Sequence, residues 1–254
     1  MNNISRINTL AAAVVLAFST SHIVNAAPSS TGESKMNQQQ VVSNTLSARQ
    51  QAIPLIAAYM ASSQMAKLNA ALNQGLDAGL TINESKEILV QLYAYTGFPR
   101  SLNALNELMK VIEARKQRGI NDVEGKEPAG PLPVGNELRA LGIANQTTIS
   151  GAPVQGPLFD FAPVINQFLQ THLFGDIFAR DNLDWQSREL ATVGALAATP
   201  GVEAQLLSHT RASQRVGLTS GQLRQLALLL REQGEHDAAT RAENALQQAL
   251  ATTK

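Results

Sequence analysis

The sequence contains no cysteine among its 254 residues. Disulfide bonds, cysteine-ligated zinc and every mechanism that depends on a thiol, including thiol peroxidase chemistry, are therefore excluded. A chain of this length can bury enough apolar surface to fold without covalent cross-links, even in an oxidising compartment. The absence of cysteine thus restricts the chemistry of the protein rather than its location.

An excess of charge of either sign is also missing, because 20 basic residues balance 20 acidic ones. There is no basic run with interleaved aromatic residues, so nucleic acid is not an expected partner. Aromatic residues form only 4% of the chain, strand-like alternation is nearly absent, and Ala, Leu and Gln, which favour helices, are abundant. We therefore expect an all-α fold.

The beginning of the chain has the pattern of a secretory signal. Residues 9–20 form an apolar run after a short polar start that carries Arg6, and small residues lead up to Ala26. The run is shorter than the about 20 residues of a membrane span. We expect residues 1–26 to be a cleaved signal peptide and residues 27–40 a flexible leader. The mature protein would be secreted or periplasmic, without stable membrane insertion; an uncleaved anchor is the alternative.

Two segments of the chain share a pattern of helix ends and helix starts. Gly79 and Gly217 each suit the left-handed end of one helix, and Thr81 and Thr219 each suit the N-cap of the next. The two pairs are 138 residues apart, far more than the about 20–50 residues of solenoid repeats. We therefore expect tandem copies of one helical domain rather than a repeat array.

The expected first domain covers residues 41–118, and the second covers residues 158–251. Between them, residues 119–157 are rich in proline and glycine, which predicts a mostly irregular linker with one short helix around residues 136–141. Within the first domain, Pro54 is expected to interrupt a helix that the second domain keeps whole.

The candidate catalytic residues are Glu189 and His209, which lie on consecutive predicted helices. The break at Pro200 and Gly201 lets these helices fold back on each other and bring both side chains to one inner surface. A carboxylate and an imidazole in an apolar cleft can exchange protons near neutral pH. A structural explanation stands beside this one, because the helix dipole favours an acid near a helix N-terminus and a helical histidine is often a hydrogen-bonded core residue.

The first domain lacks this pair, since Gln50 aligns with Glu189 and Ala71 with His209. It has other polar and aromatic residues that the second domain lacks. This complementary loss predicts one site assembled from both domains, or else a simple helix break with an aromatic contact. The predicted substrate-binding residues are Tyr95, Gly97, Phe98, Pro99 and Asn103.

The remaining histidines do not predict a metal site. His172 and His236 have no partner at metal-ligand spacing, and neither an HxxxH nor an HExxH pattern occurs. Ser208 precedes His209 directly, but adjacent residues on a helix point apart, so a serine nucleophile is not supported.

At these residues the chain resembles the carboxymuconolactone decarboxylase family, which shares its all-α fold with the alkyl hydroperoxidase D-like proteins. The most specific match is the Tyr-Ala-Tyr-Thr-Gly-Phe-Pro stretch in the first domain, joined in the second by the motifs around Glu189 and His209. The matching segments are residues 79–81, 87–99, 102–105, 174–180, 188–193 and 208–211.

The resemblance implies ring-shaped assemblies, with a homotrimer for a tandem-domain chain. It also implies two chemistries. One branch of the family decarboxylates a lactone without metal or organic cofactor. The other uses a Cys-x-x-Cys pair with a glutamate and a histidine that Glu189 and His209 resemble, and it cannot operate without cysteine.

We therefore expect an exported lyase or decarboxylase that needs no cofactor and acts on a small carboxylated or lactone-like substrate. The alternative is a non-catalytic ligand-binding or assembly protein of the same fold.

Overall fold

The computed structural model describes residues 44–251, and this part of the chain is all-helical, without a strand. The predicted all-α fold is therefore confirmed for these residues. The predicted signal peptide and leader lie outside the described residues. Across residues 44–251, no helix combines the length and the apolar character needed to cross a bilayer.

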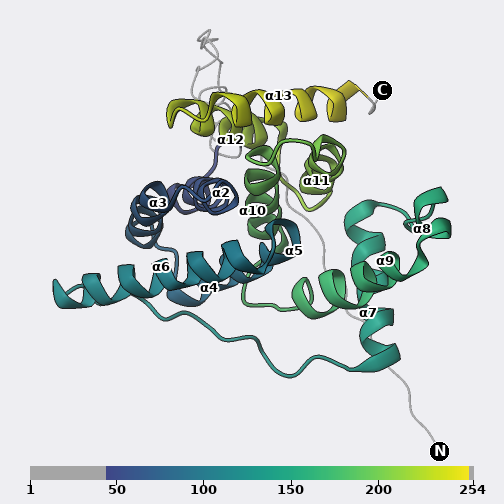
Figure 1. Cartoon of the computed structure of the whole chain (residues 1–254), viewed down its shortest axis with the longest axis horizontal. Coiled ribbons are helices and arrows are strands. Elements are labelled where there is room, and N and C mark those ends of the chain that lie inside the picture. The colour runs from purple at the N-terminus through teal and green to yellow at the C-terminus, as the bar shows by residue number, and fades with distance from the viewer. Residues whose placement is uncertain (1–43, 252–254) are drawn as a thin grey trace, which may run out of the picture. The chain divides into compact units, whose positions relative to one another are not determined.

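The helices occur in the same order in both halves of the chain (Figure 1). Helices α3, α4 and α6 each begin 138 residues before their counterparts α11, α12 and α13. The first half contains α2 (Ala48–Ala61), α3 (Met65–Asp77), α4 (Ile82–Gln91), α5 (Tyr93–Thr96) and α6 (Phe98–Gln117). The second half contains α10 (Trp185–Ala197), α11 (Glu203–Arg215), α12 (Ser220–Glu232) and α13 (His236–Ala251).

The predicted helix starts are confirmed at both repeated positions. The Thr81 side chain accepts a hydrogen bond from the backbone N–H of Glu84, and the Glu84 side chain accepts one from the backbone N–H of Thr81. Thr219 and Gln222 form the same reciprocal pair at the start of α12. The glycines before them have φ angles of 94° and 101°, the left-handed backbone that glycine adopts without steric cost. Short-range hydrogen bonds thus determine where these helices begin.

The prediction that Pro54 interrupts the first helix is wrong, because α2 runs through it from Ala48 to Ala61. The physical reason is packing. Pro54 lies where α2 crosses α10, and a Cβ on Gly194 would come within 2.5 Å of the Pro54 carbonyl oxygen. The close contact of the two backbones stabilises the helix despite the hydrogen bond that proline cannot donate.

The predicted linker is also more ordered than expected. In place of the short helix expected around residues 136–141, the structure has α7 (Gly135–Ser150), a helix of 16 residues. It packs along η1 (Leu169–Ile177), a π-helix. A Cβ on Gly142 would lie 1.6 Å from the Gln170 carbonyl oxygen, so glycine is required at this crossing. The prolines flank α7 instead of interrupting it. Two short helices, α8 (Pro157–Phe161) and α9 (Pro163–Phe168), connect α7 to η1.

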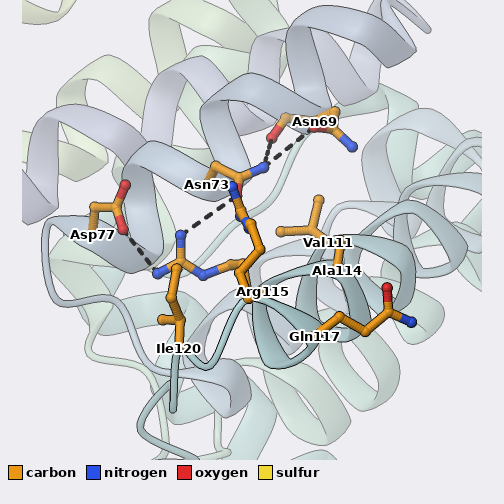
Figure 2. Close-up of a pocket in the computed structure, with 9 residues that line it drawn as sticks. Asn69, Asn73, Asp77, Val111, Ala114, Arg115, Gln117 and Ile120 are labelled. Atoms are coloured by element: carbon orange, nitrogen blue, oxygen red, sulfur yellow. Dashed lines mark hydrogen bonds and ion pairs between the residues drawn. The ribbon is translucent and has the colours of Figure 1, made fainter.

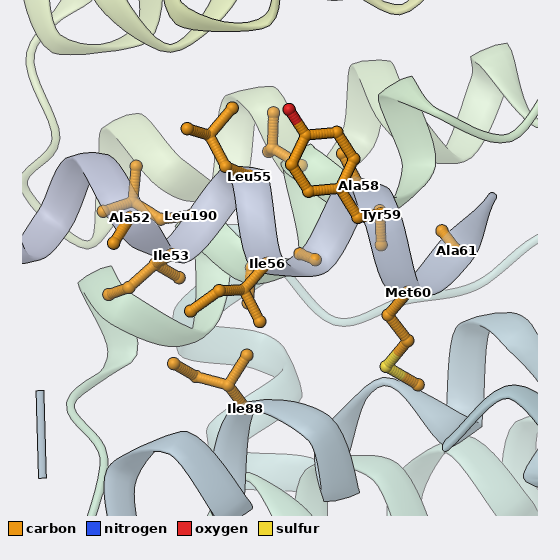
Figure 3. Packing of buried hydrophobic residues seen from close by; sticks show 14 of the residues in the cluster. Ala52, Ile53, Leu55, Ile56, Ala58, Tyr59, Met60, Ala61, Ile88 and Leu190 are labelled. Atoms are coloured by element: carbon orange, nitrogen blue, oxygen red, sulfur yellow. The ribbon is translucent and has the colours of Figure 1, made fainter. Parts of the chain in front are cut away.

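One hydrophobic core joins the two halves of the chain. Residues 52–61 of α2 are all buried, so this helix is apolar around its whole circumference and lies at the centre. It packs against α3 on one side and α10 on the other. Figure 3 shows Ile53 and Ile56 of α2 pointing toward Ile88 of α4. The core therefore crosses the boundary predicted between the two domains.

Candidate active site

Glu189 of α10 and His209 of α11 meet where the two helices pack side by side. The His209 Nδ1 atom lies 2.9 Å from the Glu189 Oε2 atom. Gly201, with a φ of 85°, lies in the turn that reverses the chain direction between the two helices. The sequence-based expectation that these two side chains share one surface thus agrees with the structure.

The two members of the pair differ in their access to solvent. The Glu189 side chain is fully buried, because residues 187–197 of α10 are all enclosed, whereas the His209 side chain keeps 13% of its surface exposed. The second carboxylate oxygen of Glu189, Oε1, is buried without a hydrogen-bond partner among the described residues. The acid is therefore enclosed, and the exposed surface of the pair belongs to His209.

Tyr95 of α5 packs against the other side of the imidazole. Its ring meets that of His209 edge-on, with centroids 5.3 Å apart and planes at 82°. Burial, together with the nearby Glu189 charge, raises the pKa of Tyr95 above its usual value of 10. The phenol is therefore neutral at physiological pH, and Tyr95 holds the imidazole in place by packing rather than by charge.

His209 lines a cavity of about 410 Å³. The helix α11 contributes one wall, and α7, α8, α9 and the π-helix η1 contribute the others. Long π-helices are rare and often occur at functional sites. The lining residues are Gln146, Ser150, Val154, Leu158, Phe159, Ile165, Leu169, Leu173, Phe174, Ala204, Gln205, Ser208 and His209. Among them, His209 is the only residue with an acid–base side chain. Because Glu189 engages Nδ1, we assign Nε2 to the ligand.

A buried charge network supports α10 behind the acid. The Arg188 guanidinium donates to the Glu87 carboxylate of α4 at 2.9 Å, and Arg180 donates to both oxygens of the same carboxylate at 2.9 and 3.0 Å. Burial alone would raise the pKa of Glu87, but the hydrogen bonds and charges of the two arginines hold it below its usual value. Glu87 is thus ionised, and its charge is shared between two cations.

Gln91 connects this network to the turn of α10 that carries Glu189. Its amide nitrogen donates to the Arg188 carbonyl oxygen at 2.8 Å and to the Thr192 hydroxyl at 3.0 Å. Its amide oxygen accepts from Arg188 at 3.0 Å. Sequence reasoning did not find Glu87 or Gln91 as supporting residues. The available signal was Arg188, a cation directly before the mostly apolar part of its helix, because a buried cation requires a partner.

None of the predicted substrate-binding residues is among those that line this cavity. Gly97, with a φ of 86°, and Pro99 form the start of α6, as in the helix-break alternative. Phe98 is 61% exposed and stacks on Tyr93, with ring centroids 4.2 Å apart. Asn103 is exposed on α6.

The physical reason is the sharp turn between α5 and α6. It directs Tyr95 inward and the residues after Gly97 outward. Of the five residues, Tyr95 alone touches the Glu189–His209 pair. Apart from four residues of α11, the residues that line the cavity come from residues 146–174, the linker and the aromatic stretch after it. The density of apolar residues in that stretch was the signal for them.

A second cavity of about 640 Å³ lies between α3 and α6 (Figure 2). Two arginines, Arg115 and Arg118, line it, and Arg115 donates to Asp77 at 2.8 Å and to Asp122 at 2.8 Å. The hydrogen bond to Asp122 and that to Asp77 raise the pKa of Arg115, although burial opposes them. Arg115 is thus permanently charged and cannot exchange protons, so this cavity lacks an acid–base group comparable to His209.

Within residues 44–251, no group of three or more histidine, aspartate or glutamate side chains is placed to hold a metal ion. His172 instead pairs with Asp176 of the same π-helix, at 2.7 Å, on an exposed surface.

Comparison with known proteins places part of the chain in a family. No curated protein matches the chain. The family model for the carboxymuconolactone decarboxylase family matches residues 163–250. This segment includes α9, η1 and α10 to α13, and with them both Glu189 and His209. Residues 163–250 are therefore a domain of the carboxymuconolactone decarboxylase family.

Proposed function

We propose that the protein is a cofactor-independent lyase or decarboxylase that acts on a small carboxylated or lactone-like substrate. The observation that supports this proposal is the position of the Glu189–His209 pair at the wall of an apolar cavity. A histidine that is held by a buried carboxylate through Nδ1 and that lines a cavity is suited to general acid–base catalysis.

The proposed reaction uses the substrate's own carbonyl group as the electron acceptor. The bond between a carbon and its carboxylate breaks, carbon dioxide leaves, and the electron pair is delocalised into the adjacent carbonyl. His209 then donates the Nε2 proton to that carbon and regains a proton from water. Glu189 accepts the Nδ1–H hydrogen bond throughout, and its charge stabilises the imidazolium form of the histidine.

The alternative function is that of a non-catalytic ligand-binding or assembly protein. Ala71, buried in α3 at the position that corresponds to His209, shows that a helix of this kind packs without the histidine. One feature favours catalysis over a purely structural pair. The Oε1 atom of Glu189 is buried without a partner, and an acid retained only for stability is expected to have both oxygens hydrogen-bonded.

The test is an assay of the purified protein against a panel of lactones and oxo-acids, with carbon dioxide release and loss of substrate as readouts. The His209→Gln variant is the matched control, since any activity from a contaminant would persist in it. Turnover by the wild type that disappears in the variant is the expected result. Binding of panel members without turnover of any of them would support the non-catalytic alternative.

We also propose that the protein is exported to the periplasm or secreted after cleavage of residues 1–26. The support is the sequence pattern of a short apolar run followed by small residues. The intact mass of the exported protein is expected to correspond to a chain that begins at Ala27. Retention of the first 26 residues in a membrane fraction would contradict the proposal.

We further propose a homotrimer. Helix α6 exposes Phe98, Leu102 and Met109, which lie along one side of the helix and are 61%, 57% and 67% exposed. Light scattering is expected to give a molar mass three times that of one chain. The Leu102→Asp variant is expected to shift the measured mass toward that of one chain. Leu228→Asp, at an exposed leucine on α12, is the control and should leave the mass unchanged. A monomer mass for the wild type would contradict the proposal.

A further inference from the structure

The walls of the Glu189–His209 cavity carry very little charge. Leu158, Phe159 and Ile165 come from α8 and α9, and Leu169, Leu173 and Phe174 come from η1. The polar lining residues other than His209 are neutral amides and hydroxyls. No lysine or arginine is among the lining residues, so His209 is the only lining side chain that can carry a positive charge.

We infer that the ligand of this cavity is an amphipathic molecule with its polar groups gathered at one end, a single carboxylate beside a lactone or keto carbonyl, and an uncharged hydrocarbon or aryl body. The inference rests on the proposed function and narrows its substrate class. A substrate with a second carboxylate would have to desolvate that charge against leucine, isoleucine and phenylalanine side chains without a counter-charge, which is strongly unfavourable.

The two ends of such a ligand have distinct surroundings. On α11, Ala204 and Ser208 are one turn apart and line the same wall as His209, so the polar group meets α11. The body then extends toward η1, α8 and α9. Leu158 and Ile165 line the cavity and are also 64% and 44% exposed, so the apolar wall continues to the protein surface. An apolar molecule can therefore reach His209 without passing a charged side chain of the lining.

The volume of the cavity, about 410 Å³, lies within the range of small-molecule sites, roughly 300–1,000 Å³. It is larger than a lactone ring alone requires. Each methylene added to the ligand should therefore find apolar wall to contact until the cavity is filled.

The experiment is a calorimetric titration of the full chain with γ-lactones that carry unbranched alkyl chains of increasing length. Affinity is expected to rise about fourfold per added methylene, the effect of burying one such group, and then to level off. The same lactones with a carboxylate at the end of a chain too short to reach the protein surface are expected to bind at least about 100-fold more weakly.

Two variants test the location of the body. Ala204→Trp fills the cavity beside His209 and should abolish the dependence on chain length. Ala66→Trp is the matched control, because Ala66 is an exposed alanine at the corresponding position of α3, 138 residues earlier. Leu158→Arg supplies a cation to the apolar wall at an exposed position and should restore binding of the chain-end carboxylates.

Affinity that is independent of chain length, or tighter binding of the chain-end carboxylates by the wild type, would overturn the inference. The same experiments can reject the proposed function independently of the ligand class. Chain-length-dependent binding without turnover of any lactone or oxo-acid would reject catalysis and leave the ligand class standing. Turnover of dicarboxylated substrates without any dependence on alkyl chain length would reject the ligand class and leave catalysis standing.

Discussion

The Arg188 guanidinium of α10 donates to the Glu87 carboxylate of α4 at 2.9 Å, although the two residues are 101 positions apart in the sequence. Both side chains are almost completely enclosed, with 0% and 3% of their surface exposed. This ion pair joins the two halves of the chain directly beside Glu189. The position of the candidate catalytic acid therefore depends on a contact with the other half.

Removing one partner of this pair is expected to destabilise the fold strongly. Glu87→Ala leaves Arg188 buried without its main counter-charge, which costs about 3–5 kcal/mol for a pair of this kind. Chemical denaturation with a helical signal measures the loss. Lys86→Ala is the control, because Lys86 pairs with Glu124 on the surface and such pairs contribute about 0–1 kcal/mol. Equal losses of stability in the two variants would show that the buried pair contributes no more to folding than the surface pair.

The stability of the protein is expected to fall in acid partly through Glu87. The arginines hold its pKa in the folded state below the usual 4.5, so the folded state binds the proton less tightly than the unfolded chain. This contribution is therefore present above about pH 4.5 and is lost as the pH falls through the folded-state pKa.

The wild type should consequently lose stability with decreasing pH more steeply than Glu87→Gln. Thermal melts of both proteins between pH 3 and pH 7, in steps of about half a unit, measure the difference that the linkage predicts. The gap between the two melting temperatures should narrow below about pH 4.5. A constant gap across the range would show that Glu87 is not the group responsible.

Replacing Glu189 or His209 with glutamine separates the catalytic from the structural role of the pair. If the pair moves protons, either change should abolish turnover and leave most of the fold intact. If the pair is structural, either change should lower the free energy of unfolding by about 1–3 kcal/mol, because one buried polar group loses its partner. Activity and melting curves are measured on the same samples. Variants that melt early yet keep wild-type turnover per folded molecule would end the catalytic assignment.

The crossing of α2 and α10 should not tolerate a side chain at Gly194. An added Cβ would approach the Pro54 carbonyl oxygen to 2.5 Å and the Pro54 Cα to 2.7 Å, and neither backbone atom can move aside. Gly194→Ala should therefore cost at least about 1–3 kcal/mol, as other overpacked cores do. Gly130→Ala, where a Cβ would meet nothing within 4 Å, is the control in the same denaturation experiment. A Gly194→Ala variant as stable as the wild type would contradict the close approach of Gly194 to Pro54.

The parts of the fold that the sequence predicted well depend on short-range interactions. The helix starts at Thr81 and Thr219 follow from hydrogen bonds within one turn. The contact of Glu189 with His209 follows from two consecutive helices and one reversal at Gly201. Few conformations satisfy such a short segment, so local patterns were sufficient to predict these features.

The sequence by itself thus determined the helical class, the helix starts at Thr81 and Thr219, and the pairing of Glu189 with His209. The tertiary structure alone decided that α2 continues through Pro54, that Glu87 reaches Arg188, and that the cavity at His209 is built from α7 to η1. Gly97, Phe98 and Pro99 were assigned to the site by pattern and lie at the start of α6 instead. The reason is physical: a cap is satisfied within about four residues, whereas a buried partner or cavity wall depends on how distant helices pack.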